Sequence, residues 1–155
     1  MTTEHAVRPV PGDVLLHVAP LAAALLVAFN DFFLKLRHPG FVSGKLSDLG
    51  LCFFFPVFVA AVLEWAVWAL VDLPRSRPFV RRRALLRAGV VLGALYFVAI
   101  KLMPAAAAWH VAALHALVSG RRFRAVADPT DLWCLPMVGL AWWYLARFAR
   151  PPATR

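Results

Sequence analysis

Residues 49–71 of this protein read LGLCFFFPVFVAAVLEWAVWALV, a run of apolar side chains with a single acidic residue, Glu64. About 20 consecutive apolar residues are enough for a helix to cross the hydrocarbon core of a bilayer. Pro56 interrupts the run, but a helix in lipid tolerates proline when neighbouring groups satisfy the carbonyl that proline leaves free. We therefore predict a transmembrane helix over residues 47–71.

The whole chain has the same apolar bias. Of its 155 residues, 62% are hydrophobic and 16% are charged, and the mean hydropathy is +0.71. Soluble domains are about 45–50% apolar and about 25% charged, so the composition excludes a disordered chain, a disulfide scaffold and an ordinary cytosolic enzyme. The length accommodates four crossings with short loops, and we expect residues 1–155 to form a single membrane domain.

Similar apolar runs place the other helices of an all-α, polytopic four-helix bundle. The expected transmembrane helices cover about 14–36, 47–71, 88–103 and 130–148. The sequence HPG at 38–40 ends the first of them. The apolar stretch 88–120 is too long for one crossing, and Pro104 is its natural break. We expect residues 105–119 to form an extra helix that lies in the outer interface or re-enters the bilayer.

The distribution of charge predicts the orientation. The chain carries 17 Lys and Arg against 8 Asp and Glu, a net charge of +9, and six of the arginines crowd the loop 73–87. Short basic loops stay cytoplasmic, so we expect this loop and both termini on the cytoplasmic side of the inner (plasma) membrane. The basic surplus thus indicates topology and not nucleic acid, and anionic lipid headgroups are the partners expected between Arg75 and Arg87.

The two halves of the chain share one ordered pattern. It consists of a Lys-Leu pair, a proline, Val-Ser-Gly with a basic residue, a Ser/Thr-Asp-Leu triplet and a second proline. We interpret this as a duplicated hairpin, which gives two parallel repeats with Lys35 over Lys101 and Asp48 over Asp131. The alternative is that lysines, Gly-Ser turns and helix caps recur wherever helices end at a membrane surface.

The expected topology brings most polar side chains of the helices to the outer end of the bundle. This layer contains four carboxylates and every lysine of the chain, although arginine outnumbers lysine 14 to 3. Lysine is a compact cation whose pKa shifts readily, so its use here indicates a polar pocket for a charged group. The candidate residues are Asn30, Asp31, Lys35, Lys45, Ser47, Asp48, Lys101, Asp128, Thr130 and Asp131.

Helix capping explains part of this set. Asp128, which precedes a proline, is typical of a helix start, and Ser47 with Asp48 is interpreted in the same way. The GKLS sequence at 44–47 lacks the upstream glycine of a nucleotide-binding phosphate loop, which excludes such a loop. A helix start beside Lys45 nevertheless offers backbone N–H groups to a phosphate or a lipid headgroup.

Capping does not explain Asp31. This acid lies in the last turns of the first expected helix, where the helix dipole disfavours a negative charge. It therefore needs a cation, and Lys35 and Lys101 are the candidates. We expect Asp31 to be the most sensitive acid of the chain, in a structural ion-pair network or in a site for a substrate, an ion or a reaction.

Residue types that commonly bind metals form no recognisable motif. Cys52 and Cys134 lie in apolar runs without a CxxC or Cys/His spacing, and we interpret them as buried hydrophobes. His110 and His115 are five residues apart and face different sides of a helix. We therefore interpret them as polar residues of a helix that lies in the membrane interface, and not as a shared metal site. Glu64 forms no recognisable motif with other residues. We predict no metal site, and no pattern indicates a cofactor.

Three segments carry a resemblance: NDFFLK at 30–35, GKLSDLGL at 44–51 and ADPTDL at 127–132. Together they resemble small integral-membrane proteins of GC-rich bacteria. The resemblance implies a bacterial inner membrane and no particular activity.

Three functions are compatible with this pattern. The first is an outward-facing Asp/Lys pocket that binds a charged small molecule, an ion or a lipid headgroup. The second is a small membrane enzyme that acts on a lipid or a lipid-linked phosphate, with carboxylates as general bases and lysines near the phosphate. The third is a non-catalytic accessory or assembly subunit, for which an oligomer or a membrane partner protein is expected.

Overall fold

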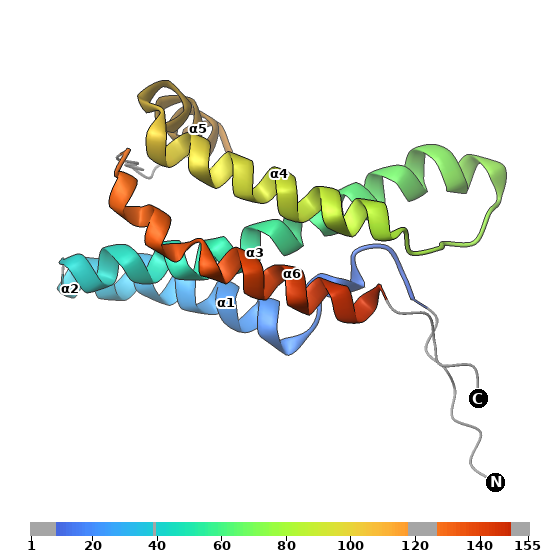
Figure 1. Ribbon diagram of the computed structural model, residues 1–155, viewed down its shortest axis with the longest axis horizontal. Coiled ribbons are helices and arrows are strands. Elements are labelled where there is room, and N and C mark those ends of the chain that lie inside the picture. The colour runs from blue at the N-terminus through green and yellow to red at the C-terminus, as the bar shows by residue number, and fades with distance from the viewer. Residues whose placement is uncertain (1–8, 39, 118–126, 150–155) are drawn as a thin grey trace, which may run out of the picture.

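The computed structural model describes residues 9–38, 40–117 and 127–149. Every regular element in these residues is helical, and the long helices form an elongated bundle (Figure 1). The expectation of an all-helical protein is confirmed.

Three helical runs are long and apolar enough to cross a membrane. The first run comprises α1 (Val18–Phe29), the π-helical η2 (Asn30–Leu34) and α2 (Lys35–Arg37). The second run comprises α3 (Phe41–Val67), the π-helical η3 (Trp68–Asp72) and the 3₁₀ turn η4 (Leu73–Arg75). The third run is α4 (Arg83–Leu102).

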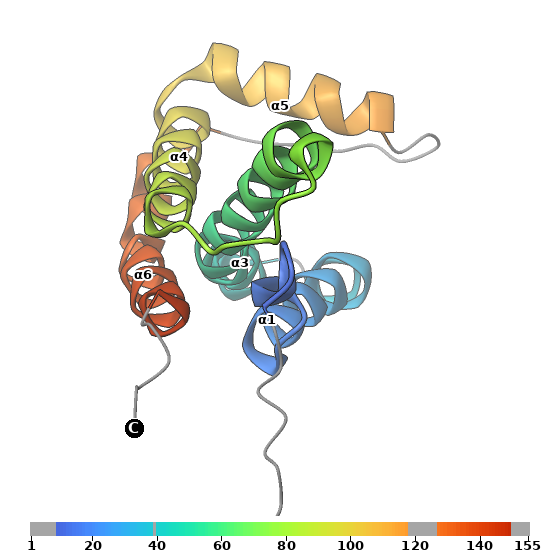
Figure 2. The ribbon, with the colours of Figure 1, turned by 90° about the vertical axis from the view of Figure 1, so that its right-hand side faces the viewer.

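The remaining elements are shorter. They are η1 (Asp13–Leu15), α5 (Pro104–Leu117), the 3₁₀ helix η5 (Pro129–Cys134) and α6 (Pro136–Phe148). Figure 2 shows α5 crosswise to the long helices. α6 has 13 residues, about 20 Å at 1.5 Å per residue, which is less than the roughly 30 Å of a bilayer core. Because Pro136 restarts the helix after η5, the expected fourth crossing over 130–148 is divided and is not among the runs of spanning length.

α3 begins at Phe41, six residues before the expected start at Ser47. The helix start is stabilised by Ser43, whose Oγ accepts a hydrogen bond from the Gly40 N–H at 3.1 Å. Ser47 therefore lies inside the helix, and its interpretation as a cap is wrong. The helix start expected beside Lys45 is wrong for the same reason, because Lys45 also lies within α3.

The other boundaries differ less. α4 begins at Arg83 and not near residue 88, which shortens the arginine-rich loop to residues 76–82. The first run ends at Arg37, just before the HPG sequence, and the extended backbone of Met103 separates α4 from α5, as expected from Pro104. Residues 118–121, which contain the end of the expected outer helix and the second Val-Ser-Gly, lie outside the described residues. The duplication stays a prediction.

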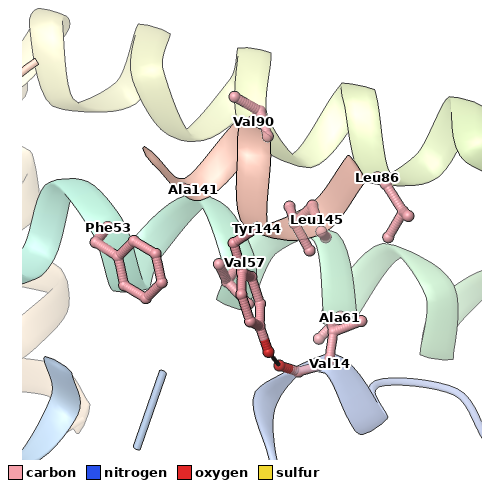
Figure 3. Packing of buried hydrophobic residues seen from close by; sticks show 10 residues of the cluster. Val14, Phe53, Val57, Ala61, Leu86, Val90, Ala141, Tyr144 and Leu145 are labelled. Carbon is pink, nitrogen blue, oxygen red and sulfur yellow. Dashed lines mark hydrogen bonds between the residues drawn. The ribbon is translucent and has the colours of Figure 1, made fainter. Parts of the chain in front are cut away.

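α3 is the centre of the bundle and packs against α1, α4 and α6. Figure 3 shows the buried apolar side chains that these elements share with η1. They include Val14, Phe53, Val57, Ala61, Leu86, Val90, Ala141, Tyr144 and Leu145. The Tyr144 hydroxyl donates a hydrogen bond to the Val14 carbonyl at 2.7 Å, which ties η1 to α6.

Two glycines allow α4 to approach α3 closely. A Cβ atom added at Gly89 would lie 2.5 Å from the backbone of Ala60, and one added at Gly93 would lie 2.8 Å from the Cα atom of Pro56. Helices in lipid associate largely through such van der Waals packing of small residues. The Gly89–Gly93 face therefore sets the distance between α3 and α4, both of which line the cavity described below.

The end of the bundle at loop 76–82 is held by a buried ion pair. Glu64 is fully buried, and its carboxylate accepts hydrogen bonds from Arg81 Nε at 2.9 Å and from the Gly12 N–H at 3.2 Å. Arg81 also pairs with Asp13. No partner of Glu64 was recognisable from the sequence, because Arg81 and Gly12 are 17 and 52 residues away along the chain.

We expect Gly89→Ala to destabilise the protein, because the new methyl group overlaps the backbone of α3. Overpacking of this kind costs about 1–3 kcal/mol, more than the helix propensity gained from alanine. The thermal unfolding midpoint in detergent measures the loss. The control is Gly139→Ala in α6, where nothing lies within 4 Å of the added Cβ. Equal midpoints for the two variants would contradict the close approach.

Candidate functional site

A cavity of about 540 Å³ lies at the end of the bundle opposite loop 76–82. Its walls come from the first helical run, α3, α4, α5 and η5. Four of the eight acidic residues of the chain and all three lysines line it, namely Asp31, Asp48, Asp128, Asp131, Lys35, Lys45 and Lys101. Apolar side chains such as Val27, Leu51 and Ile100 line the rest. The structure thus brings the charged candidates together in one place.

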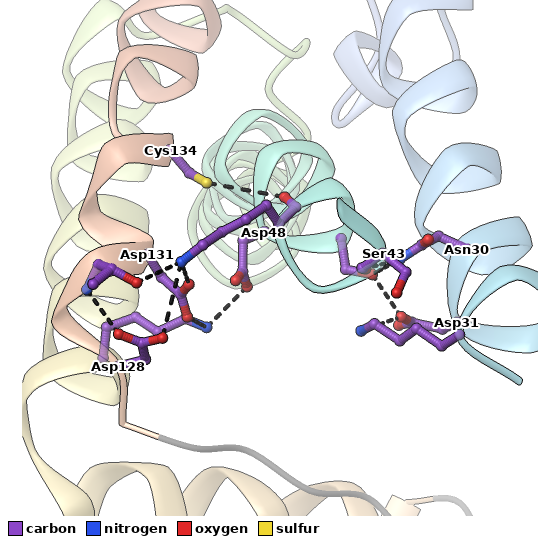
Figure 4. A network of polar contacts seen from close by, with 12 residues as sticks. Asn30, Asp31, Ser43, Asp48, Asp128, Asp131 and Cys134 are labelled. Carbon is purple, nitrogen blue, oxygen red and sulfur yellow. Dashed lines mark hydrogen bonds and ion pairs between the residues drawn. The ribbon is translucent and has the colours of Figure 1, made fainter. Parts of the chain in front are cut away.

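Four of these residues form a chain of ion pairs. Lys45 pairs with Asp131, whose Oδ2 lies 2.5 Å from Lys101 Nζ, and Lys101 Nζ lies 2.9 Å from Asp48 Oδ1. The chain alternates in charge and connects α3, α4 and η5 (Figure 4). The four side chains are only 10–18% exposed. We call this set the ion-pair chain.

Local structure places each member of the ion-pair chain. Lys45 and Asp48 are three residues apart in α3 and share a face. Lys101 lies in the last turn of α4, where the helix dipole favours a cation. Asp131 lies in the first turn of η5. Lys45 Nζ also donates to Thr130 Oγ1 at 2.7 Å, which adds Thr130 to this group.

Asp128 caps η5, as the sequence predicts. Its Oδ1 accepts a hydrogen bond from the Thr130 N–H at 2.9 Å, and this bond holds the pKa of the Asp128 carboxyl below its usual value. The second carboxylate oxygen lies 3.9 Å from Lys45 Nζ. Asp128 is therefore a carboxylate at neutral pH, at the edge of the cavity.

A second polar group lies across α3 from the ion-pair chain, as Figure 4 shows. Asn30 is fully buried in η2, and its Nδ2 donates to the Ser43 carbonyl at 2.6 Å and to Ser47 Oγ at 2.5 Å. The Ser47 hydroxyl donates to Asp31 Oδ1 at 2.5 Å, and Lys35 Nζ lies 2.6 Å from the same oxygen. The expected pairing of Asp31 with a lysine is confirmed, and the partner is Lys35.

Asn30 and Asp31 lie in the π-helical turn η2. π-helical turns within α-helices are rare and occur frequently at functional sites. Asn30 Oδ1 is buried without a hydrogen-bond partner among the described residues. A buried oxygen without a hydrogen-bond partner costs stability.

The charged side chains differ in their access to the cavity. Asp31, Lys35 and Asp128 are 40–45% exposed, whereas the members of the ion-pair chain are mostly covered. The first three are the charges most accessible to a ligand, although Asp31 and Lys35 contact each other. The ion-pair chain forms a wall whose charges already satisfy one another.

His110 is a cavity residue that the sequence interpretation missed. It lies on α5, lines the cavity, and has its Nδ1 atom 2.6 Å from the Tyr96 hydroxyl. Burial lowers the pKa of His110, and the Lys101 ammonium lowers it further, so the neutral imidazole is favoured at pH 7. A signal was present, because α5 was expected at the same end of the bundle as the lysines.

The cysteines lie beside the site. Cys52 and Cys134 are buried in one apolar cluster with Phe97 and Ile100, as expected for buried hydrophobes. In the described ranges, no group of three His, Cys, Asp or Glu side chains is arranged to hold a metal ion. The carboxylates of the cavity contact lysines instead.

No known protein family, curated protein or solved structure matches this chain.

The geometry ranks Asp131 above Asp31 as the acid on which stability depends. Asp131→Asn leaves the Lys45 and Lys101 ammonium groups without their shared counter-charge, a loss of about 3 kcal/mol or more for a buried pair. Asp31→Asn removes one half-exposed pair, worth less than about 1 kcal/mol. Unfolding midpoints and folded yield in detergent compare the two. A larger loss for Asp31→Asn would show that this ranking is wrong.

Proposed function

We propose that this protein is a multi-pass protein of a bacterial inner membrane whose cavity binds a small molecule that carries both a positive and a negative group. The observation that carries the proposal is the convergence of four carboxylates and every lysine of the chain on one cavity. Asp31 and Asp128 would contact the cationic group of the ligand, and Lys35 the anionic group.

The mixture of charges favours a ligand of both signs. A simple anion entering the cavity meets four carboxylates, and a simple cation meets three ammonium groups. A molecule that carries both groups satisfies both kinds of side chain and leaves the ion-pair chain intact. Breaking that chain would expose partly buried charges, which is costly.

Size and lining support the same ligand class. A volume of about 540 Å³ is within the range of about 300–1,000 Å³ that small-molecule sites occupy, and it is far larger than a bare ion needs. The apolar wall near Val27, Leu51 and Ile100 suits the carbon atoms of such a ligand. Both a free zwitterion and a zwitterionic lipid headgroup have this chemistry.

The direction from which the ligand enters depends on topology. Arg81 donates to the Val10 carbonyl at 3.4 Å and Arg83 to the Ala149 carbonyl at 2.7 Å, so both ends of the described chain lie beside loop 76–82. The arginines near this loop favour the cytoplasmic side, which makes the opposite cavity face outward.

A reporter inserted at Ser76 tests the orientation, because this residue lies in the turn that ends η4. We expect the activity of a cytoplasmic reporter and none from a reporter that requires export. A matched fusion after Ala149 should give the same answer. Export of the Ser76 fusion would mean that the cavity faces the cytoplasm.

Phosphoethanolamine, which carries an ammonium and a phosphate, tests the ligand class. We expect it to raise the unfolding midpoint of the full chain in neutral detergent more than ethanolamine or inorganic phosphate does, because binding to the folded state alone stabilises it. Phosphatidylethanolamine in the same micelles distinguishes a lipid headgroup from a free zwitterion.

Three variants localise the binding. Asp31→Asn and Lys35→Gln should weaken the binding of phosphoethanolamine at least tenfold with little change in stability. Arg82→Gln removes a half-exposed charge from the other end and should bind normally. Binding that survives both cavity variants would place the ligand elsewhere.

The accessory-subunit hypothesis remains a second candidate because the charges of the ion-pair chain already pair with one another. In that case none of the probes raises the midpoint, and a partner or a second copy does. Release of product that depends on Asp31 would instead identify an enzyme.

A further inference from the structure

A second concave site lies between α4 and α6 at the arginine end of the bundle. Figure 2 shows these two helices side by side along one flank. The groove has a volume of about 200 Å³. Its lining includes Arg83, Leu86, Arg87, Trp142, Leu145 and Ala146. None of these residues belongs to the cavity of the proposed function.

The arginines of this region divide into paired and unpaired residues. Arg81 pairs with Glu64 and Asp13, and Arg82 pairs with Asp72 at 2.8 Å. No carboxylate lines the groove or pairs with Arg83 or Arg87 in the part of the chain that the structure describes. Among the described residues, the groove therefore carries two positive charges with no carboxylate beside them.

Arg83 and Arg87 are placed to act together. They are four residues apart on α4 and so share a face. Arg83 Nε donates to the Ala149 carbonyl at 2.7 Å, which fixes the guanidinium and leaves its terminal nitrogen atoms for another acceptor. α4 begins at Arg83, so the positive end of its dipole lies at the same mouth.

The rest of the groove is apolar. Leu86 and Leu145 are buried at its floor, and Trp142 is half-exposed at its side. Tryptophan is enriched at the level of lipid headgroups, where one edge of the ring is wet and the other is dry. α4 is long and apolar enough to span a membrane and begins at Arg83, so the groove lies at the level of one interface when α4 spans the bilayer.

We propose that this groove binds an anionic phospholipid. The phosphodiester contacts Arg83 and Arg87, and one acyl chain lies against Leu86, Trp142 and Leu145. Arginine recognises phosphate through several N–H donors at once. A choline headgroup would bring its own cation toward two arginines, so phosphatidylcholine binds more weakly. This inference is independent of the ligand of the other cavity.

Native mass spectrometry of the delipidated full chain in neutral detergent tests the proposal, with phosphatidylglycerol and phosphatidylcholine as probes. We expect phosphatidylglycerol to bind at least tenfold more tightly than phosphatidylcholine. The double variant Arg83→Gln/Arg87→Gln should lose this preference. The matched control Arg75→Gln/Arg77→Gln removes the same charge outside the groove and should keep it.

A variant in the apolar part of the groove distinguishes binding of the lipid within the groove from general electrostatic attraction of the lipid to the arginines. Ala146→Phe fills the groove while both arginines remain, and it should weaken phosphatidylglycerol binding at least tenfold. Equal losses in the two arginine double variants, or full binding by Ala146→Phe, would overturn the proposal. Displacement of the lipid by an equal concentration of glycerol phosphate would also overturn it, because the acyl chain would then contribute nothing.

Discussion

Asp131 accepts hydrogen bonds from two lysines that belong to two different helices. This contact joins the short η5–α6 segment to α3 and α4, and it closes one side of the cavity. An acid between two ammonium groups is stabilised only while both remain in place, since removing any member strands a partly buried charge. The position of η5, the wall of the cavity and the separation between covered and accessible charges all depend on this arrangement.

The sequence predicted the fold class well, but it predicted the start of α3 and the pairing of side chains between helices poorly. Apolar runs predicted an all-helical membrane protein, and Pro104 and the HPG sequence predicted two helix ends correctly. The start of α3 was missed because the prediction placed the cap at Ser47, whereas the N-cap residue is Gly40 and Ser43, in the first turn, accepts a hydrogen bond from the Gly40 N–H. The concentration of lysines at one end of the bundle predicted which charged side chains lie near one another. The individual pairs between helices, such as Lys45 with Asp131, depend on how each helix is rotated about its own axis, and a local sequence pattern does not determine that rotation.

The two ends of the bundle use different cations for physical reasons. Arg81 joins Glu64, Asp13 and a backbone carbonyl, which requires the several directed donors of a guanidinium. The cavity end uses lysines, whose compact ammonium groups fit between carboxylates on neighbouring helices. Arginine therefore holds Val10, at the start of the described chain, to the loop 76–82, and lysine lines the cavity.

Asp131 follows Lys101 by 30 residues and Lys45 by 86. In a chain that inserts into a bilayer as it is made, the two lysines therefore enter when Asp48 is the only carboxylate of the ion-pair chain already made. Ionisable groups without partners are costly in that environment. The ion-pair chain becomes neutral only when Asp131 has been added, so a chain that stops before η5 carries one lysine of this set without a carboxylate partner.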